Sequence, residues 1–294
     1  MKYAWITKHR DMFPIIAMSK SFNVSTSGYY KSLLQRVSKR AQRTQTIRQQ
    51  VKKLHDESNH IYGSYKIANL MNEDDASESA CRNTVAKAMK EMGLKSRVSK
   101  SFTPTTTRSD ESKKPADNIL DQDFYADAPN RKWVTDITYL AVDGGWVYLA
   151  VVLDLFSRKV VGWAISESLA TPLFSEALRK AIEARQPETD KLLHHSDRGC
   201  QYTSDEYQHV LKTMSITCSM SRTGCCYDNA VMERFFWSLK HEWTNFEDFA
   251  DIEEARLGVF EYIEGFYNSK RIHQTLRYKS PNEFEENYFN KLIA

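Results

Sequence analysis

Residues 133–139 read WVTDITY, and this stretch decides the fold that we expect. β-branched and aromatic residues surround a single acid, Asp136, as they do in a buried strand. A second strand is expected over 146–154, because residues 142–145 (VDGG) have the chemistry of a hairpin turn. A third strand, 159–165 (KVVGWAI), follows after a short turn. The pattern therefore predicts three consecutive antiparallel strands.

Helical and strand patterns alternate downstream of these strands. We expect a helix over 171–185, a strand over 192–196, a helix over 204–214 and a strand over 216–220. A helix over 229–242 comes next. An antiparallel meander followed by crossovers predicts an α/β protein with a mixed five-stranded sheet and helices on its faces. This arrangement has the outline of the ribonuclease-H-like fold.

The first third of the chain predicts short helices. Helices over 12–20 and 25–36, with a tight turn between them, have the outline of a helix-turn-helix. A second helical group is expected over 44–57, 65–72 and 79–92. Polar and basic residues lie along its last helix, where a groove-reading helix would place them: Arg82, Asn83, Thr84, Lys87 and Lys90. We expect them to contact DNA, although three-helix modules also serve as protein–protein adaptors.

Charge is distributed unevenly along the chain. The net charge is +3, but residues 1–114 hold 22 Lys and Arg against 10 Asp and Glu, while the remainder holds 19 against 28. A basic first part joined to an acidic second part points to a polyanionic partner, with nucleic acid as the first candidate. No apolar run approaches the roughly 18–20 residues that cross a bilayer. The N-terminus lacks the apolar stretch of a signal peptide, and the five scattered cysteines are typical of reduced thiols. We expect a soluble intracellular protein.

Three acids lie where the predicted fold would bring them together. Asp136 is in the first strand, Asp197 follows the fourth, and Glu233 is inside the helix expected over 229–242. Clustered carboxylates raise one another's pKa unless a cation neutralises them. Oxygen-only ligands favour Mg²⁺ or Mn²⁺ over zinc. We expect two such ions, which would activate a water or a DNA 3′-hydroxyl and stabilise the leaving oxygen.

The sequence around these acids resembles the DDE transposases of bacterial insertion sequences related to retroviral integrases, and most closely the OrfB product of the two-reading-frame, IS-three type. The resemblance covers nearly the whole chain. Its motifs are, in order, HR and FP (9–14), SGYY (27–30), YG (62–63), W and TDITY (133–139), D, SR and VGW (154–163), HSDRG and QY (195–202), YDNA and E (227–233), LK (239–240), YN, R and H (267–273) and SP (280–281). The 35 residues between Asp197 and Glu233 belong to the same pattern.

The resemblance implies roles for individual residues. The three acids would bind the metal ions and catalyse DNA strand cleavage and strand transfer at insertion-sequence ends. Lys240, seven residues after Glu233 and on the same helical face, would contact the transposon end. Asn229 and Arg234 flank the acid and could also touch DNA, but a helix cap and a surface charge explain them equally well.

The resemblance also implies partners. They are DNA, both as inverted-repeat ends and as target, an OrfA subunit or a frameshifted OrfA–OrfB fusion, and further copies of the chain on DNA. A cytoplasmic, nucleoid-associated location in a bacterium follows. The zinc-binding N-terminal domain of retroviral integrases is not expected, because His55 and His60 are present but Cys81 is alone. Cys200 and the 225–226 cysteine pair depart from the family pattern, which we interpret as loop variation.

We divide the chain into five parts: a helix-turn-helix-like segment (1–40), a second helical DNA-binding module (41–95), a basic linker (96–128), a ribonuclease-H-like catalytic core (129–245) and a C-terminal helix with a basic tail (246–294). Two alternatives remain open. One is a stand-alone nuclease on the same fold, which the basic helical first part argues against. The other is a non-catalytic DNA-binding regulator derived from a transposase, which the intact acidic triad argues against.

Overall fold

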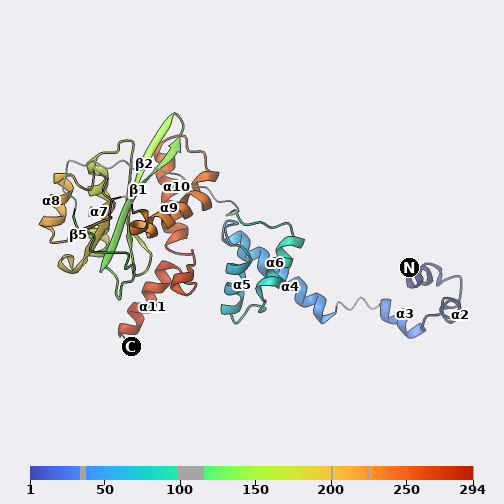
Figure 1. The fold of residues 1–294 in the computed structure, drawn as a ribbon. Helices are drawn as coiled ribbons and strands as arrows, with labels where there is room; N and C mark the ends of the chain where they lie inside the picture. Colours follow the sequence, from blue (N-terminus) through green and yellow to red (C-terminus); the bar gives the residue numbers. More distant parts are fainter. Residues whose placement is uncertain (34–37, 98–115, 200, 224, 294) are drawn as a thin grey trace.

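The structure, a computed structural model, describes residues 1–33, 38–97, 116–199, 201–223 and 225–293. The end of the helix expected over 25–36, most of the expected linker and Cys200 lie outside the described residues. Figure 1 shows three units in chain order: a small group of helices, a second helical group, and a larger unit that contains the sheet. No helix in the described ranges is both long and apolar enough to cross a lipid bilayer.

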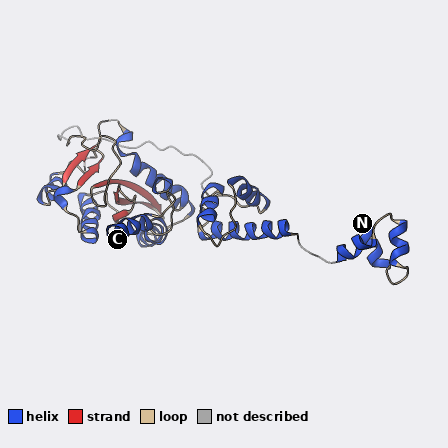
Figure 2. Cartoon of the chain, turned by 90° about the horizontal axis from the view of Figure 1, so that it is seen from below, coloured by secondary structure: helices blue, strands red, loops and turns tan. Residues whose placement is uncertain are grey.

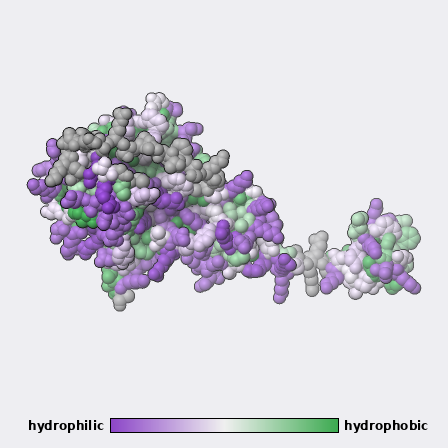
Figure 3. Space-filling model, viewed as in Figure 1, coloured by the Kyte–Doolittle hydropathy of each residue, from purple (hydrophilic) through white to green (hydrophobic). Residues whose placement is uncertain are grey.

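Three helices form the N-terminal unit: α1 (Lys2–His9), α2 (Ile15–Ser21) and α3 (Thr26–Leu33). Its buried core is small and consists of Ile6, Met18 and Tyr29. The sequence predicted α2 and α3 but not α1, because α1 buries a single side chain and has little apolar periodicity. Large apolar side chains remain exposed on this unit, and Figure 3 shows hydrophobic colour on its surface.

The second helical unit consists of α4 (Lys39–Glu57), α5 (Ser64–Glu73) and α6 (Arg82–Glu91). Ser38 caps α4, since its hydroxyl accepts a hydrogen bond from the backbone N–H of Ala41. Each helix contributes apolar side chains to a shared core: Ile47, Val51, Ile67, Met71, Val85 and Met89. The three helices that the sequence predicted here are all present.

The third unit contains a mixed five-stranded sheet, and its strands are gathered at one end of the molecule in Figure 2. The strands are β1 (Lys132–Val142), β2 (Gly145–Asp154), β3 (Val160–Ser166), β4 (Leu193–Ser196) and β5 (Thr217–Met220). Their order is β3-β2-β1-β4-β5. The first three pair antiparallel, while β4 lies parallel to both β1 and β5. This topology confirms the predicted ribonuclease-H-like fold.

Helices cover both faces of the sheet, because alternate strand residues point to opposite sides. On one face, α7 (Thr171–Arg185) and α8 (Asp205–Thr213) pack against the sheet. On the other face lie α9 (Ala230–Glu242) and α10 (Ile252–Phe260). Helix α10 continues as a π-helical segment, η4 (Glu261–Tyr267).

Close packing of α7 on the sheet depends on a glycine in β3. A Cβ atom on Gly162 would lie 2.4 Å from the carbonyl oxygen of Ala177 and 2.7 Å from the Cβ of Ala181. Any larger residue would therefore push the helix away from the strand. This is the physical reason for a glycine inside the VGW motif.

The chain ends in a helix, α11 (Pro281–Ile293), where the sequence analysis expected only a basic tail. The helix is anchored by Glu285, which is 4% exposed. Its carboxylate accepts two hydrogen bonds of 2.8 Å from the Arg185 guanidinium and one of 2.7 Å from the Ser157 hydroxyl. These partners are more than 90 residues away in the sequence, so local patterns could not identify them.

The described end of the expected basic linker, residues 116–128, packs against the sheet-containing unit. Leu120 is 1% exposed, and its backbone N–H donates to the Ser219 hydroxyl oxygen at 3.0 Å, as does that of Ile119. The N–H of Met220 donates in turn to the carbonyl oxygen of Asp117 at 3.2 Å. This segment therefore lies against the end of β5.

The second helical unit contacts the C-terminal part of the third through Tyr62. This side chain is 4% exposed, and its hydroxyl donates to the carbonyl oxygen of Lys270 and accepts from the N–H of Ile272, both at 3.0 Å. The ring of Tyr65 lies 6.1 Å from that of Tyr278. Apolar side chains of both units belong to one continuous buried cluster.

Candidate active site

Asp136 lies within β1, and Asp197 directly follows β4, the strand that pairs parallel with β1. β1 and β4 pair with Val134 opposite His195, and each acid follows its member of that pair by two residues. Two residues along a strand return the side chain to the same face. The sheet therefore brings together two acids that are 61 positions apart in the sequence.

Glu233 reaches the same region from helix α9. It lies in the first turn, where the helix dipole favours a negative charge, and its side chain is exposed. The start of the helix is tied to the sheet by Asn229, whose side-chain amide donates to the carbonyl oxygen of Thr135 at 3.3 Å. Because Thr135 precedes Asp136 and Glu233 follows Asn229 by one turn, this tie holds the helix beside the two strand acids.

The electrostatics of the three acids reflect their proximity. Burial, then the charge of Asp197 and then that of Glu233 raise the pKa of Asp136 well above its ordinary value, although the N–H of Ile137 donates to it at 2.8 Å. Burial also raises the pKa of Asp197, against a 2.9 Å hydrogen bond from the N–H of Gly199.

Among the described residues, no ion pair offsets the charge of these acids. In the described part of the chain, no Lys or Arg forms an ion pair with any of the three. Partly buried carboxylates without their own counter-ion are expected to bind cations. An oxygen-only ligand set fits a hard divalent cation such as Mg²⁺ or Mn²⁺.

The three carboxylates are not as tightly grouped as the ligands of a single small ion. Among the described residues, one set of three His, Cys, Asp or Glu side chains has all its ligand atoms within 4.8 Å of one another, and it consists of His55, Asp56 and His60. The acidic triad is more widely spaced. Two ions about 3.5–4 Å apart would need such wider spacing.

Two further residues support the site, one from the QY motif and one from the YDNA motif, and their sequence patterns alone indicated no role for them. Tyr202 is 1% exposed, and burial together with the charges of Asp136 and Asp197 raises the pKa of its hydroxyl well above the ordinary value. This ring therefore lies close beneath the two strand acids. The second such residue is Asp228, which is fully buried in the loop before α9.

Asp228 holds together the segments around the start of α9. Arg222 donates to its carboxylate from Nη2 at 3.0 Å, from Nε at 3.1 Å and from its backbone N–H at 2.8 Å. Side-chain amides of Asn118 and Gln122 donate at 2.9 Å each. The Arg222 hydrogen bonds are the main cause of the lowered pKa of Asp228. Asn118 and Gln122 lie more than 100 residues before Asp228, so sequence spacing could not reveal this role.

Lys240 lies farther along α9 and is half-buried. Its ammonium nitrogen is 4.3 Å from the centre of the Tyr139 ring, and burial lowers its pKa. Tyr139 follows Asp136 by three residues on β1. The lysine therefore lies over a side chain of the strand that carries the first acid.

The other two residues predicted on α9 differ in accessibility. Arg234 is exposed and stacks on Trp237, with its guanidinium carbon 4.4 Å from the ring centre. Asn229 is only 6% exposed, and although it occupies the N-cap position its side chain makes no capping hydrogen bond. Its side-chain amide instead makes the tie to the strand, and its contact with DNA stays a prediction.

The five residues predicted to read DNA lie on α6, and all are exposed: Arg82, Asn83, Thr84, Lys87 and Lys90. The opposite face of the helix is buried against α4 and α5. Arg82 lies 5.8 Å from the ring centre of Tyr65, and Lys87 forms a 4.0 Å ion pair with Glu91. This solvent-facing set is separate from the acids in sequence and comes from the second helical unit.

Comparison with known families identifies both units. The family model "Integrase core domain" matches residues 126–226, a second model with the same description matches 214–281, and an "HTH-like domain" model matches 42–102. Fold and site thus define a protein with an integrase-type catalytic core and a helix-turn-helix-like module.

Solved structures of retroviral integrases are among those that match part of this chain. The catalytic core domain of the HTLV-2 integrase, in complex with magnesium, matches 55% of this chain and 99% of its own at 16% identity, with a TM-score of 0.43. The simian T-cell lymphotropic virus intasome in complex with the PP2A regulatory subunit B56 gamma matches 80% of this chain and 74% of its own at 15% identity, with a TM-score of 0.46.

Similarity to curated proteins is higher and extends over the whole chain. Transposase InsF for insertion sequence IS3A of Escherichia coli K12 is 40% identical over 296 residues, covering 100% of both chains. A Shigella sonnei protein described as "Insertion element IS600 uncharacterized 31 kDa protein" is 36% identical over 271 residues, covering 92% of this chain and 98% of that one. The chain belongs to the transposases of the IS3 family, which confirms the predicted family and its function in DNA transposition.

Proposed function

We propose that Asp136, Asp197 and Glu233 are the catalytic acids of this transposase and that together they hold two Mg²⁺ or Mn²⁺ ions. The observation that carries the proposal is the register of β1 and β4, which brings Asp136 and Asp197 together. The raised pKa of Asp136, to which burial and the charges of the other two acids contribute, supports it. The absence of an ion-paired Lys or Arg on these acids, within the described residues, supports a cation-binding role.

The chain's own residues contribute position and charge to the reaction. When bound, the divalent cations supply activation of the attacking oxygen and stabilisation of the leaving oxygen. The register of β1 and β4 sets the backbone positions from which Asp136 and Asp197 project. Glu233 is exposed on α9 and can approach the other two by a rotamer change. Asn229 keeps that helix against β1.

DNA would lie across the acids and the exposed basic residues. We propose that Lys240 contacts a backbone phosphate of the transposon end next to the cleaved bond, and that Arg234 contacts a neighbouring phosphate. The exposed face of α6 would read a more distant part of the end, with Arg82, Lys87 and Lys90 on phosphates and Asn83 and Thr84 on base edges.

Proteins also belong to the proposed assembly. We propose that the transposase acts with OrfA or as the OrfA–OrfB fusion, and that several copies assemble on DNA. Exposed apolar side chains of the N-terminal unit, such as Met12, Phe13 and Ile16, favour a protein contact there. We also propose the five-part division of the chain, with boundaries after residues 40, 95, 128 and 245.

A strand-transfer assay tests the function. Full-length protein, alone or supplied with OrfA, is incubated with Mg²⁺ and a duplex that carries the element's end. We expect both nicked and joined products, and we expect Asp136→Asn, Asp197→Asn and Glu233→Gln each to abolish both. The exposed acid Asp190 offers a matched control, Asp190→Asn, which keeps full activity.

The alternatives give different products. Nicks without joined products would support a stand-alone nuclease. If the unaltered protein binds the end duplex but gives no product, a regulator would be supported. Full activity of the triad variants would contradict the proposed roles of the acids.

A further inference from the structure

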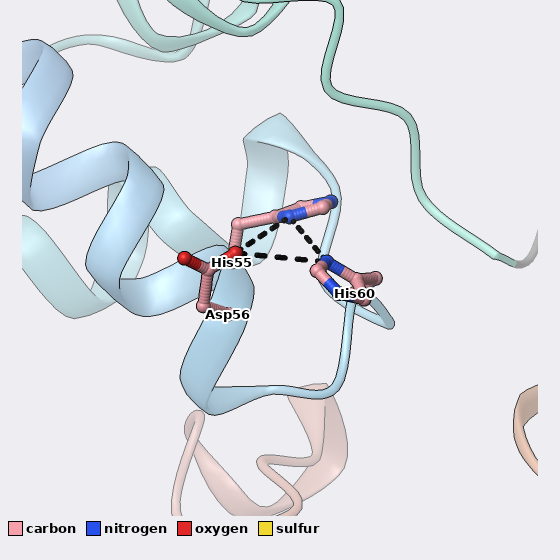
Figure 4. Close-up of side chains that lie close together, drawn as sticks. All are labelled: His55, Asp56 and His60. Atoms are coloured by element: carbon pink, nitrogen blue, oxygen red, sulfur yellow. Dashed lines mark hydrogen bonds and ion pairs between the residues drawn. The ribbon is translucent and has the colours of Figure 1, made fainter.

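A second group of metal-ligating side chains lies in the HTH-like module, away from the acidic triad. It consists of His55, Asp56 and His60, at the C-terminal end of α4 and in the turn after it (Figure 4). The Nδ1 atoms of the two histidines are 3.0 Å apart. The Asp56 carboxylate oxygen is 3.8 Å from the first of them and 3.7 Å from the second.

We propose that these three side chains bind a zinc ion. The three distances define a point about 2 Å from all three atoms, which matches Zn–N distances of about 2.0–2.1 Å and Zn–O distances of about 2.0–2.2 Å. Imidazole nitrogens favour zinc over Mg²⁺, which prefers oxygen ligands. Water would supply a fourth ligand.

The proton positions on His55 favour this assignment. The side chain is 2% exposed, and its Nε2 lies 3.2 Å from the carbonyl oxygen of Lys95. A carbonyl oxygen only accepts, so Nε2 carries the proton and Nδ1 presents its lone pair to the cluster. A metal-binding histidine usually has its second nitrogen fixed by a backbone carbonyl in this way.

The backbone turn after α4 brings His60 back to His55. Asn59 and His60 have φ values of 51° and 64°, in the left-handed region that asparagine and histidine adopt more readily than most residues. The turn lets the N–H of His60 donate to the carbonyl oxygen of His55 at 2.9 Å and places the two ring centres 4.7 Å apart.

The site lies where the HTH-like module joins the catalytic core. The carbonyl oxygen of His60 accepts from the N–H of Arg97 at 2.9 Å, which ties the turn to the last described residues before the linker. Two residues after His60 comes Tyr62, whose hydroxyl binds the core. Zinc would therefore stabilise the junction of the two units, independently of catalysis.

The competing explanation is a simple hydrogen bond from the His60 Nδ1–H to His55 Nδ1. It requires no metal and leaves Asp56 without a function. Metal content separates the two explanations. To remove zinc bound by the acidic triad, the parent protein carries Asp136→Asn and Asp197→Asn. It is stripped with chelator, dialysed against micromolar Zn²⁺ with Mg²⁺ in excess, and its zinc is measured by mass spectrometry.

We expect His60→Ala and Asp56→Ala each to bind one equivalent less zinc than this parent. Both residues are about half exposed, so the fold should persist, which circular dichroism checks. His209→Ala, at an exposed histidine of α8, is the matched control and should lose none. Zinc should also raise the Tm of the parent by a few degrees, and this shift should vanish in His60→Ala.

Two results would overturn the proposal. One is a parent protein that takes up no zinc. The other is equal zinc content in the parent and the His60→Ala protein, which would place any bound ion elsewhere, for example on the cysteines. Neither result touches the role of the acidic triad, since the triad is already disabled in the parent.

Discussion

Asp136 on β1 and Asp197 at the end of β4 stand level with each other, because each follows by two residues one member of the pair Val134 and His195. The register of a parallel strand pair therefore sets the separation of two acids. Since the pKa of each acid is raised, holding the two charged carboxylates together lowers the stability of the metal-free protein.

Asp136→Asn should stabilise the metal-free protein. The pKa of this carboxyl group is higher in the folded than in the unfolded chain, so its charge destabilises the fold at a pH above the folded-state pKa. The penalty shrinks as the pH falls below the folded-state pKa and is gone below the unfolded-state pKa. In chelator at pH 7.5 we expect the Tm to rise by about 2–4 °C, or ~1 kcal/mol. Mg²⁺ should raise the Tm of the unaltered protein but not that of the variant. A lower Tm in chelator would contradict this account, and Asp190→Asn is the neutral control.

Asn229→Ala should impair activity far more than stability. It removes the hydrogen bond to the Thr135 carbonyl and lets the start of α9 move away from β1. Strand transfer should fall by about 10–100-fold, as for other residues that orient metal ligands, while stability should fall by ~1 kcal/mol. Asp251→Ala, which removes the cap of α10, is a control of similar stability cost. Equal activity losses in the two variants would leave Asn229 with no specific role.

Asp228→Ala should destabilise the fold by about 1–3 kcal/mol, because it removes the buried acceptor shared by Asn118, Gln122 and Arg222. The pKa of Asp228 is lowered in the folded protein, so its contribution is present above the unfolded pKa near 3.8 and is lost as the pH falls toward the lowered value. Denaturant unfolding of the unaltered protein and of Asp228→Ala at pH 7 and pH 3 measures the loss of stability and its dependence on pH. Asp121→Ala, which removes the exposed second partner of Arg222, should change stability little.

Lys240→Ala should weaken binding of the transposon end and make it less dependent on salt. Loss of one phosphate contact lowers the slope of log K against log salt by about 0.9. Fluorescence anisotropy across a salt series measures this slope. Lys212→Ala, on exposed α8, removes the same charge elsewhere and should leave the slope unchanged. An unchanged slope for Lys240→Ala would exclude a phosphate contact.

Tyr62→Phe should loosen the contact between the HTH-like module and the core. The change removes a hydroxyl that bonds both Lys270 and Ile272, at a cost of about 1–3 kcal/mol. Faster hydrogen exchange at Ile272 would report the loss. Tyr125→Phe, at a tyrosine that is 73% exposed, is the control. Unaltered exchange at Ile272 would show that the contact does not depend on the hydroxyl.

The sequence was sufficient for features that depend on local pattern. Alternation and turn chemistry identified β1 to β3, and apolar periodicity identified α4 to α10 within a few residues. Given that topology, the positions of Asp136 and Asp197 followed, since the strands were expected to be neighbours. The spacing of seven residues likewise predicted that Lys240 and Glu233 share one face of α9.

Features that depend on distant partners could not be predicted in this way. The buried pair of Glu242 and Arg271, with two hydrogen bonds of 2.6 Å, joins α9 to a loop 29 residues farther on. Glu285 pairs with Arg185 across 100 residues. Such contacts have no period in the sequence, and each charge alone is typical of a solvated surface.

The central claim is that the three acids hold divalent cations, and crystals grown with Mn²⁺ test it most directly. Anomalous scattering locates Mn²⁺ without reference to the protein model. We expect strong peaks bonded to carboxylate oxygens of Asp136, Asp197 and Glu233, which disappear in Asp136→Asn. Fully occupied peaks elsewhere, with none between these acids, would contradict the claim.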